Sequence, residues 1–340
     1  MDVATPPVSD VSTPSPLLDP LLASVPTVEG HKLLGQTVLL EPIGSGGMGV
    51  VYRGWHMTFR MVVAVKVLKP ELAGDRDYVR RFRQEAHTAL RITHQNVVRV
   101  YDLGEQGDVS FLVMEWVDGE SSRQRVRRLG RLPVPDALAA FAGAANGLAE
   151  AHLHGLVHGD VKPSNLLIAR AGRVKVADLG LVQPMEDDEA APGGRRAVLG
   201  TPQYLAPELW DGAAPRPAAD LWALGATLYH LVTGRHGLPK LPKDELRRLV
   251  RDEPFPTVGS VLASVPGLDD VVARGVERDP ARRFADAGEL VRALGVLGVP
   301  DETLLRDPTW APGGDPQGLP ANEVLGRIDE RLRRWRRRPL

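Results

Sequence analysis

The spacing of hydrophobic and polar positions changes about one third of the way along the chain. Between residues 37 and 117, short β-branched runs alternate with polar residues, a period of two that is typical of half-buried strands. The expected strands are Thr37–Pro42, Val50–Arg53, Val62–Leu68, Val97–Leu103 and Phe111–Val117, and one helix, Arg76–Arg91, interrupts them. After Gly119 the apolar positions recur every three to four residues and predict helices near 134–154, 217–233, 244–252, 267–276 and 285–296. The pattern therefore predicts an α+β protein with two lobes, a small β-rich one and a larger helical one.

We expect the two lobes to span residues 33–118 and 119–297. Segments of different composition flank them. Residues 1–32 are rich in Pro, Ser and Thr without a sustained period, which indicates a disordered arm. Residues 298–320 are rich in Pro and Gly and indicate a linker. Residues 321–340 predict a basic amphipathic helix that docks on this chain or on a partner; binding to an anionic membrane surface is a third alternative.

Composition excludes several kinds of site. The chain has no cysteine, so it holds no disulfide, thiolate zinc site or cysteine nucleophile. Its formal net charge of −1 provides no argument for a nucleic-acid partner. No apolar run of about eighteen residues and no secretory signal is present, so we expect a cytoplasmic chain without a transmembrane segment. Only 7 of the 42 basic residues are lysine, which makes each lysine informative because arginine and lysine differ in reach and geometry.

A glycine-rich run follows the first expected strand. It reads G-x-G-x-x-G and consists of Gly44, Ser45, Gly46, Gly47, Met48 and Gly49. Glycines let backbone amides approach phosphate oxygens without obstruction. In a dinucleotide-binding fold such a run opens a helix, but here the β-branched residues Val50 and Val51 follow. The context favours a hairpin tip that covers the phosphates of ATP, with an ordinary glycine hairpin as the alternative.

A lysine lies in an apolar strand near this run. Lys66 ends the sequence Val-Ala-Val-Lys, and a buried ammonium group is costly unless it is paired. Glu85, in the helix that follows, is the expected partner, and the pair would orient Lys66 toward the phosphates. In the alternative interpretation, Lys66 and Glu85 are both solvated charges on the surface.

The strongest signal is the run from His158 to Asn165, followed thirteen residues later by Asp178-Leu179-Gly180. This pattern resembles the catalytic loop and the metal-binding motif of the bacterial Hanks-type (eukaryotic-like) serine/threonine protein kinases. The resemblance implies that Asp160 is the catalytic base and that Lys162 steadies the γ-phosphate. It also implies that Asn165 and Asp178 bind Mg²⁺, with Mn²⁺ as a possible substitute, since phosphoryl transfer uses hard oxygen ligands.

Three downstream motifs extend the resemblance to residues 36–296. They are the substrate-docking segment Gly200–Glu208, the helix motif Asp220–Gly225, and Arg283, which is expected to pair with Glu208. By similarity, Asp220 hydrogen-bonds the catalytic loop. The family also implies the nucleotide-binding residues: Val51, Ala64 and Leu167 around the adenine, Met114 as gatekeeper, and Glu115 to Val117 as the hinge.

The implied activity is that of a serine/threonine protein kinase. Such an enzyme transfers the γ-phosphate of ATP to Ser or Thr hydroxyls of protein substrates, and autophosphorylation is expected. Lys162, two residues after Asp160, is the version of the loop found in serine/threonine kinases.

The chain departs from the family pattern at Gly159, where most relatives have the arginine that receives an activating phosphate. Residues 179–200 also contain no Ser, Thr or Tyr. We therefore expect a kinase that needs no phosphorylation of its activation segment, and we expect Thr201 to bond Asp160 and Lys162.

Two other functions fit part of the pattern. Small-molecule phosphotransferases of the aminoglycoside and choline type share the His-Gly-Asp loop but lack the motifs that contain Glu208 and Asp220. A pseudokinase would keep the fold without turnover, but the residues of the catalytic set are all intact.

Two clusters of basic residues are interpreted conservatively. Five arginines between Arg123 and Arg131 indicate a solvated helix face, with attraction of acidic substrates as the alternative. His152, His154 and His158 lack a carboxylate at ligand spacing, and His158 is better explained as part of the catalytic-loop scaffold.

Overall fold

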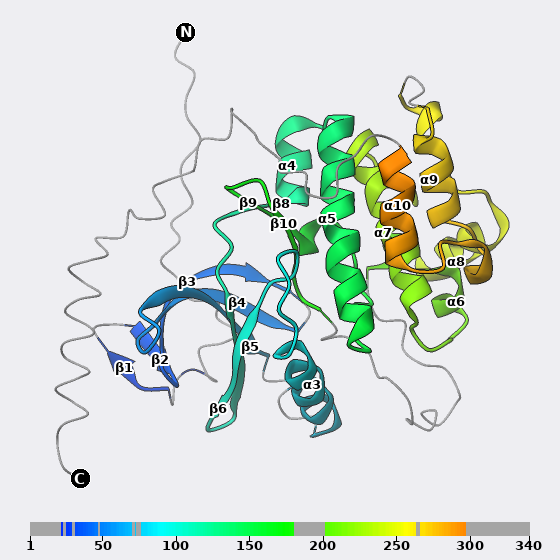
Figure 1. The fold of residues 1–340 in the computed structure, drawn as a ribbon. Coiled ribbons are helices and arrows are strands. Elements are labelled where there is room, and N and C mark those ends of the chain that lie inside the picture. The colour runs from blue at the N-terminus through cyan, green and yellow to red at the C-terminus, as the bar shows by residue number, and fades with distance from the viewer. Residues whose placement is uncertain are drawn as a thin grey trace, which may run out of the picture. The chain divides into compact units, whose positions relative to one another are not determined.

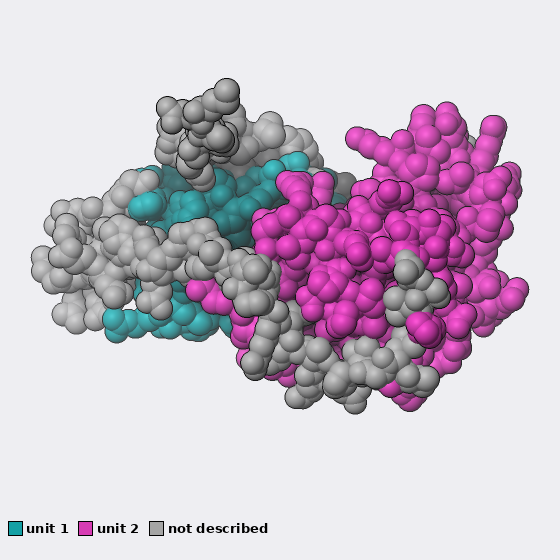
Figure 2. Space-filling model, turned by 90° about the horizontal axis from the view of Figure 1, so that it is seen from above, with its two compact units in different colours: residues 1–83, 100–116, 312–340 teal, residues 84–99, 117–311 magenta. Residues whose placement is uncertain are grey.

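The computed structural model describes residues 22, 25–28, 31–46, 48–69, 72, 76–179, 201–262 and 266–296. These residues fall into two compact units, drawn in different colours in Figure 2. The first holds the described residues up to 83 together with 100–116, and the second holds 84–99 and the described residues from 117 onward. The first is built on a β-sheet and the second is mainly helical, so the predicted α+β organisation is confirmed.

The first unit is an antiparallel sheet with the strand order β1-β2-β3-β4-β5-β7-β6. Its strands are β1 (Thr27–Val28), β2 (His31–Leu34), β3 (Thr37–Ser45), β4 (Gly49–His56), β5 (Met61–Leu68), β6 (Val100–Gln106) and β7 (Val109–Glu115), and helix α3 (Arg76–Ala89) follows β5. All five predicted strands are present. The fourth begins three residues later than expected because Val97 forms a parallel bridge with Val176, and Val98 donates its N–H to the Val176 carbonyl.

A hairpin that the sequence did not reveal precedes these strands. Strands β1 and β2 pair antiparallel, and the expected arm boundary at residue 32 lies inside β2. Leu22 and Val25 are 4% and 3% exposed and pack in the apolar cluster of the sheet. Burying two such side chains stabilises a fold by roughly 3–6 kcal/mol, so ordered structure begins before residue 33.

One face of the sheet carries this apolar cluster. Residues two apart on a strand share a face, which is why the alternating apolar positions of β5 and β7 meet there. The cluster consists of Leu22, Val25, Leu34, Leu39, Val50, Tyr52, Val63, Val65, Val67, Val109, Phe111 and Val113.

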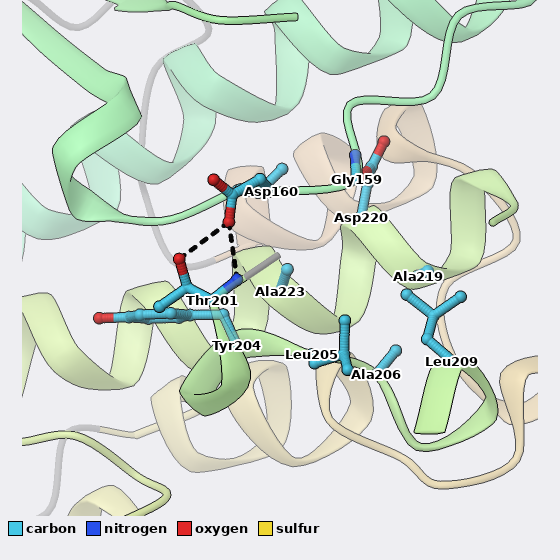
Figure 3. A pocket seen from close by; sticks show the side chains of 11 residues that line it. Gly159, Asp160, Thr201, Tyr204, Leu205, Ala206, Leu209, Ala219, Asp220 and Ala223 are labelled. Carbon is cyan, nitrogen blue, oxygen red and sulfur yellow. Dashed lines mark hydrogen bonds between the residues drawn. The ribbon is translucent and has the colours of Figure 1, made fainter. Parts of the chain in front are cut away.

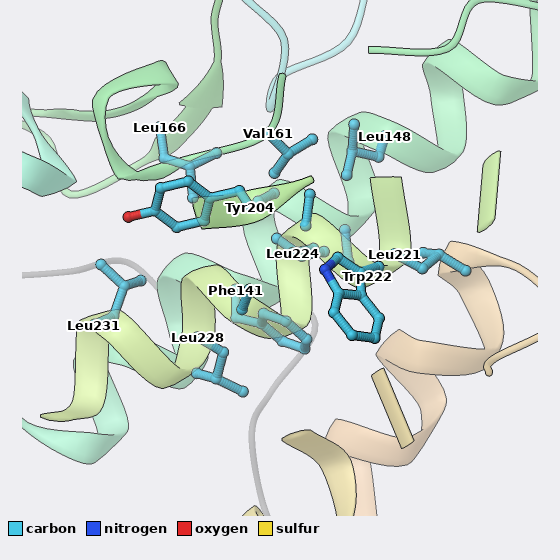
Figure 4. Packing of buried hydrophobic residues seen from close by; sticks show 14 of the residues in the cluster. Phe141, Leu148, Val161, Leu166, Tyr204, Leu221, Trp222, Leu224, Leu228 and Leu231 are labelled. Carbon is cyan, nitrogen blue, oxygen red and sulfur yellow. The ribbon is translucent and has the colours of Figure 1, made fainter. Parts of the chain in front are cut away.

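The second unit is built around α5 (Val134–Leu153) and α7 (Pro217–Thr233), whose residues are apolar on most sides and therefore buried. Figure 4 shows Phe141 and Leu148 among the residues packed with Leu221, Leu224 and Leu228. The other helices are α4 (Ser122–Leu129), α6 (Pro207–Trp210), α8 (Lys243–Asp252), α9 (Leu268–Gly275) and α10 (Ala287–Val296), labelled in Figure 1. A small sheet, ordered β10-β9-β8, consists of β8 (Gly119–Ser121), β9 (Leu166–Ala169) and β10 (Val174–Val176).

Helix α4 corrects the interpretation of the arginine run as a purely solvated face. A capping box formed by Ser121 and Gln124 starts the helix. Arg125 is 3% exposed and bonds Glu120 at 2.8 Å, and Arg128 bonds the same carboxylate at 2.7 Å. Arg123, Arg127 and Arg131 are exposed. The run therefore divides between a buried ion pair and free surface.

Several predictions fall outside the described residues. They concern Gly47, Gly180, most of the arm, the linker 298–320 and the helix 321–340. Within the ranges that the structure describes, no helix is long and apolar enough to cross a membrane.

Candidate functional site

A buried carboxylate on α7 holds the loop that carries the candidate base. Asp220 is 1% exposed and accepts hydrogen bonds from the backbone N–H groups of His158 and Gly159, both at 2.8 Å. The ring Nε2 of His152 lies 2.8 Å from the same carboxylate. These donors satisfy a charge that would otherwise be costly to bury. The predicted bond between Asp220 and the catalytic loop is therefore confirmed.

His158 is a scaffold residue, as predicted. It is fully buried, its Nε2 lies 3.0 Å from the Ala177 carbonyl, and its Nδ1 accepts the N–H of Asp160 at 3.3 Å. Because a carbonyl only accepts, Nε2 carries the ring proton and Nδ1 is the acceptor. The ring thus connects the loop before Asp160 with the segment before Asp178.

Three side chains meet at the centre of the site. Lys162 Nζ donates to Asp160 Oδ2 at 2.5 Å and to Thr201 Oγ1 at 2.7 Å. The N–H and hydroxyl of Thr201 donate to Asp160 Oδ1 at 3.0 and 2.9 Å, as the dashed lines in Figure 3 mark. The prediction that Thr201 bonds both Asp160 and Lys162 is confirmed. A hydroxyl group already lies against the candidate base, in the position that a base needs for proton transfer.

The candidate metal ligands lie beside this centre. Asn165 Nδ2 donates to the backbone carbonyl of Asp160 at 2.9 Å, which directs the amide oxygen away from that bond. The Ala177 N–H donates to the Asn165 carbonyl at 2.8 Å, so Asp178 follows directly after a residue tied to Asn165. Asp178 has a φ of 58°, a conformation that side chains other than glycine rarely adopt. An amide oxygen and a carboxylate are hard donors that fit Mg²⁺.

A small pocket opens next to Asp160. Figure 3 shows Leu205, Ala206, Leu209, Ala219 and Ala223 on its apolar side, with Asp160 and Thr201 at its polar end. The pocket lies between the catalytic loop and the segment that follows Thr201.

An ion pair between a buried arginine and a partly buried glutamate braces that segment, as predicted. Arg283 Nη1 and Nη2 donate to the two oxygens of Glu208 at 2.8 and 2.7 Å. The guanidinium also donates to the carbonyls of Glu277, Ala218 and Arg278 and lies 5.2 Å from the ring centroid of Trp222. With its side chain 0% exposed, Arg283 is matched by one carboxylate and three carbonyls.

The first unit gathers the nucleotide candidates on the face of the sheet opposite its apolar cluster. Lys66 is paired in register with Val51 on β4, and Ala64 with Met114 on β7. Opposed residues share a face, so these four side chains lie together. Lys66 is 5% exposed, which argues against the alternative of a surface charge. Glu115 ends β7, opposite Val63.

The glycine run forms the tip of a hairpin, as predicted. Ser45 pairs with Val50, and the Gly46 N–H donates to the Gly49 carbonyl at 2.9 Å. A Cβ at Gly49 would lie 2.2 Å from the Val67 carbonyl oxygen, so packing within the sheet requires this glycine. A Cβ at Gly44 or Gly46 would meet nothing within 4 Å, so packing does not explain those two.

The remaining candidates belong to the second unit. Glu85 lies on α3 and is partly buried, Val117 follows β7, and Leu167 lies on β9 opposite Ser121 and Lys175. The pairing of Lys66 with Glu85 and the contact of Leu167 with adenine stay predictions.

One group of titratable side chains is not apparent from the sequence. The Tyr204 hydroxyl lies 2.6 Å from His230 Nδ1 and 3.3 Å from His236 Nδ1. Tyr204 and His230 are 6% and 8% exposed. Burial raises the pKa of Tyr204 above its ordinary value. The pKa of His230 is lowered to about 4. Burial is the largest cause, and the positive charges of His236 and Arg123 are smaller ones. Nothing in the local sequence marks these residues, because they are 26 and 32 positions apart from Tyr204.

This lowered pKa predicts a loss of stability in mild acid. The unfolded chain binds a proton at His230 below about pH 6.5, whereas the folded chain binds it only near pH 4. Unfolding therefore takes up a proton in this window, and about 3 kcal/mol of unfolding free energy is lost as pH falls through it. Urea titrations from pH 7 to pH 4 measure the loss. The variant His230→Asn keeps an acceptor for Tyr204 but does not titrate, so its loss should be smaller; equal losses in both proteins would contradict the assignment.

Comparisons with known proteins agree with this geometry. The protein kinase domain family matches residues 37–284. The chain is 38% identical over 262 residues to the serine/threonine-protein kinase PknL of Mycobacterium tuberculosis, covering 76% of this chain and 65% of PknL. It is 32% identical over 269 residues to the serine/threonine-protein kinase PrkC of Bacillus subtilis, covering 77% of this chain and 40% of PrkC. The chain thus spans less than two thirds of the length of these relatives.

Solved structures give the same result. The crystal structure of the Mycobacterium tuberculosis PknI kinase domain aligns with a TM-score of 0.65 and 28% sequence identity. The alignment covers 80% of this chain and 99% of that domain.

Proposed function

Since the chain belongs to the protein kinase domain family, we propose that it is a serine/threonine protein kinase that transfers the γ-phosphoryl group of ATP to Ser and Thr hydroxyls of proteins. One observation carries the proposal: the hydroxyl of Thr201 donates to Asp160 at 2.9 Å, while Lys162 contacts both side chains. This is the arrangement that a substrate hydroxyl needs in order to lose its proton to a carboxylate.

Each central residue has a distinct role in this proposal. Asp160 orients the attacking hydroxyl and accepts its proton. Lys162, which already neutralises Asp160 at 2.5 Å, places its positive charge where negative charge develops on the transferred group. Thr201 positions the substrate-docking segment against the base. Asp220 and His158 act through the backbone, since they hold the loop and do not reach the reacting atoms.

Magnesium is the metal that the donor set fits best. Asn165 and Asp178 would hold it, and a bound divalent ion would neutralise the phosphate oxygens of ATP. The tie between the Ala177 N–H and the Asn165 carbonyl keeps the two ligand-bearing segments together. Mn²⁺ has similar ligand preferences and is expected to substitute.

The proposed nucleotide contacts follow from the resemblance to the protein kinase family. Gly44 and Gly46 have no packing reason to be glycine, which supports a role in admitting phosphate groups. Lys66, paired with Glu85, would contact the phosphates. Val51, Ala64, Met114, Glu115, Val117 and Leu167 would contact the adenine. With ATP as co-substrate, we place this domain in the cytoplasm.

The two alternatives account for less of the structure. A small-molecule phosphotransferase has no use for the segment after Thr201, yet here Arg283 and Glu208 brace it with two hydrogen bonds. A pseudokinase has no need to keep a carboxylate, a lysine and a hydroxyl in mutual contact.

The test incubates purified protein with Mg-ATP and a protein substrate and maps the modified residues by mass spectrometry. Phosphorylation of Ser or Thr residues would support the proposal if the reaction stops when the metal is chelated and resumes when Mg²⁺ or Mn²⁺ is added. Nucleotide binding without any turnover would indicate a pseudokinase.

Independence from activation-segment phosphorylation is a separate prediction. Thr201, the hydroxyl nearest the base, is held by Asp160 and Lys162, and a phosphate on it would place two negative groups together. Protein treated with phosphatase should keep its full initial rate of substrate phosphorylation. A stoichiometric phosphate on Thr201 that rises and falls with activity would contradict this.

A further inference from the structure

Arg53 connects the nucleotide face of the sheet with the predicted hinge. It lies on β4, paired in register with Ala64 on β5, and Ala64 is paired with Met114 on β7. Opposed residues share a face, so Arg53 lies on the face that carries the nucleotide candidates. Trp116 follows β7 directly and is the central residue of the predicted hinge.

Two contacts fix the guanidinium group of Arg53. Its Nη1 donates at 3.0 Å to Oε1 of Glu41 on β3, the strand next to β4 in Figure 1. The guanidinium carbon lies 5.5 Å from the ring centroid of Trp116, within the range of roughly 6 Å for a cation–π interaction. The side chain of Arg53 is 12% exposed and that of Glu41 is 37% exposed. Because the guanidinium group is largely shielded from water, its interaction with the indole ring is stronger than at an exposed site.

The strand pairing of the sheet ends just before Trp116. Glu115 is the last residue of β7 and pairs with Val63 on β5. Trp116 lies beyond this register, so pairing between β5 and β7 does not fix its position. The contact with Arg53 ties the Trp116 ring to β4, and the bond to Glu41 ties Arg53 in turn to β3. The hinge is thereby held by side chains where the backbone ladder has ended.

We propose that Arg53 is a positioning residue for nucleotide binding, which holds Trp116 and the hinge in the geometry that receives the adenine. The inference rests on the proposed function and adds to it a residue that acts through Trp116. ATP binds those molecules whose hinge has this geometry, and the apparent dissociation constant rises in inverse proportion to their fraction. Loss of the Arg53 contact lowers that fraction. Nucleotide binding then weakens while the chemical step is unchanged.

The test measures the dissociation constant of a non-hydrolysable ATP analogue with Mg²⁺ by calorimetry on the full chain. Arg53→Met keeps an unbranched side chain of similar reach but removes the charge, and it should raise the constant about fivefold. Arg53→Lys should recover part of the affinity, because an ammonium group also interacts with the face of an indole ring.

Turnover assays and unfolding distinguish positioning from general support of the sheet. For Arg53→Met, the KM for ATP should rise by about the same factor as the dissociation constant, while kcat and the KM for a protein substrate stay unchanged. A residue that only stabilised the sheet would lower the free energy of unfolding and leave the nucleotide affinity unchanged. That second result would overturn the inference.

A double-mutant cycle shows whether Arg53 acts through Trp116. Trp116→Leu should weaken nucleotide binding by a similar factor, and Arg53→Met should have no further effect in that background. Factors that multiply would overturn the inference. Glu41→Gln removes a partly exposed ion pair and should raise the dissociation constant about twofold. If Arg53→Met does not fold, Trp116→Leu and Glu41→Gln decide: weaker binding in both supports the inference, and unchanged affinity in either overturns it.

Arg83→Met is the matched control. Arg83 lies in the same unit and pairs with Glu105, but its side chain is 49% exposed, so its replacement should leave the nucleotide affinity unchanged.

Failure of the inference and failure of the proposed function give different results. If the chain phosphorylates its substrate and Arg53→Met binds the analogue as tightly as the unmodified protein, the inference is wrong and the kinase activity stands. If the chain binds the analogue but turns over no ATP, the proposed function fails and the affinities of the variants still decide the inference. An unmodified chain that binds no nucleotide would overturn both.

Discussion

Replacing Asp160 with asparagine is expected to lower kcat for phosphoryl transfer about 1000-fold, since general-base catalysis contributes roughly 10²–10⁴-fold. The fold should survive, because the substitution leaves the two backbone bonds of this residue unchanged. Its N–H donates to His158 Nδ1 and its carbonyl accepts from Asn165 Nδ2. Asparagine keeps an oxygen that accepts from Thr201, but it cannot take a proton from a hydroxyl.

The measurement is the initial rate of phosphate transfer at saturating Mg-ATP, with nucleotide affinity determined in parallel. Affinity for ATP should change little, because Asp160 is not among the proposed nucleotide contacts. Asp211→Asn is the control: its carboxylate is 66% exposed and pairs with Arg247 at the surface, so activity should stay near that of the unmodified protein. A variant at Asp160 that retained a tenth or more of the rate would show that another group takes the proton.

Replacing Arg283 with alanine is expected to lower the free energy of unfolding by about 3–5 kcal/mol, because it leaves the partly buried Glu208 carboxylate uncompensated and removes a donor from three backbone carbonyls. Glu208 would lose both of its guanidinium bonds. Three backbone carbonyls, of Glu277, Ala218 and Arg278, would lose a donor at the same time. Arg283→Lys should recover part of the loss, because an ammonium group restores the charge but not the paired geometry.

The neighbouring residue provides the control. Arg282 is 70% exposed and lies 3.7 Å from Glu277, so Arg282→Ala should change the unfolding free energy by less than about 0.5 kcal/mol. Chemical denaturation followed by circular dichroism measures both variants. A loss below about 1 kcal/mol for Arg283→Ala would mean that the brace contributes little to folding. In the kinase proposal, Arg283→Ala should also reduce activity through the segment after Thr201.

The predictions for Asp160 and Arg283 distinguish an effect on the reaction rate from an effect on stability. In the kinase proposal, Asp160 contacts the substrate hydroxyl, so its replacement should affect the rate with little effect on stability. Arg283 is remote from the hydroxyl and should affect stability first. Asp220 and His158 also belong to the supporting group, because their contacts hold the backbone of the loop.

Much of the site was readable from the chain because its chemistry is local in sequence. The loop from His158 to Asn165 contains the candidate base, the candidate lysine and a candidate metal ligand within eight residues. The alternation along β5 predicted a buried Lys66, and the β-branched run after Gly49 predicted a hairpin tip. Period and spacing along a strand or a loop dictate which side chains share a face, and no distant contact is needed to see it.

The arginine run of α4 has a feature that spacing along the chain did not predict. On the sequence, five arginines between Arg123 and Arg131 form one basic stretch. A helix turns its residues by about 100° per position, so Arg125 is directed inward to Glu120 while Arg123 is exposed. Helix propensity and composition do not predict which arginines are buried, because burial depends on what packs against each face of α4.

What the sequence by itself determined is therefore the α+β organisation and the hairpin of the glycine run, since each depends on local period or on a short motif. The candidate catalytic, lysine and metal-ligand positions come from the resemblance of short motifs to the protein kinase family. Only the tertiary structure decided that Leu22 and Val25 join the core of the sheet, that Arg125 is buried, and that Tyr204 meets His230 and His236. These contacts join segments that are far apart in sequence. They form because burial of apolar surface and pairing of buried polar groups select one arrangement of the whole chain.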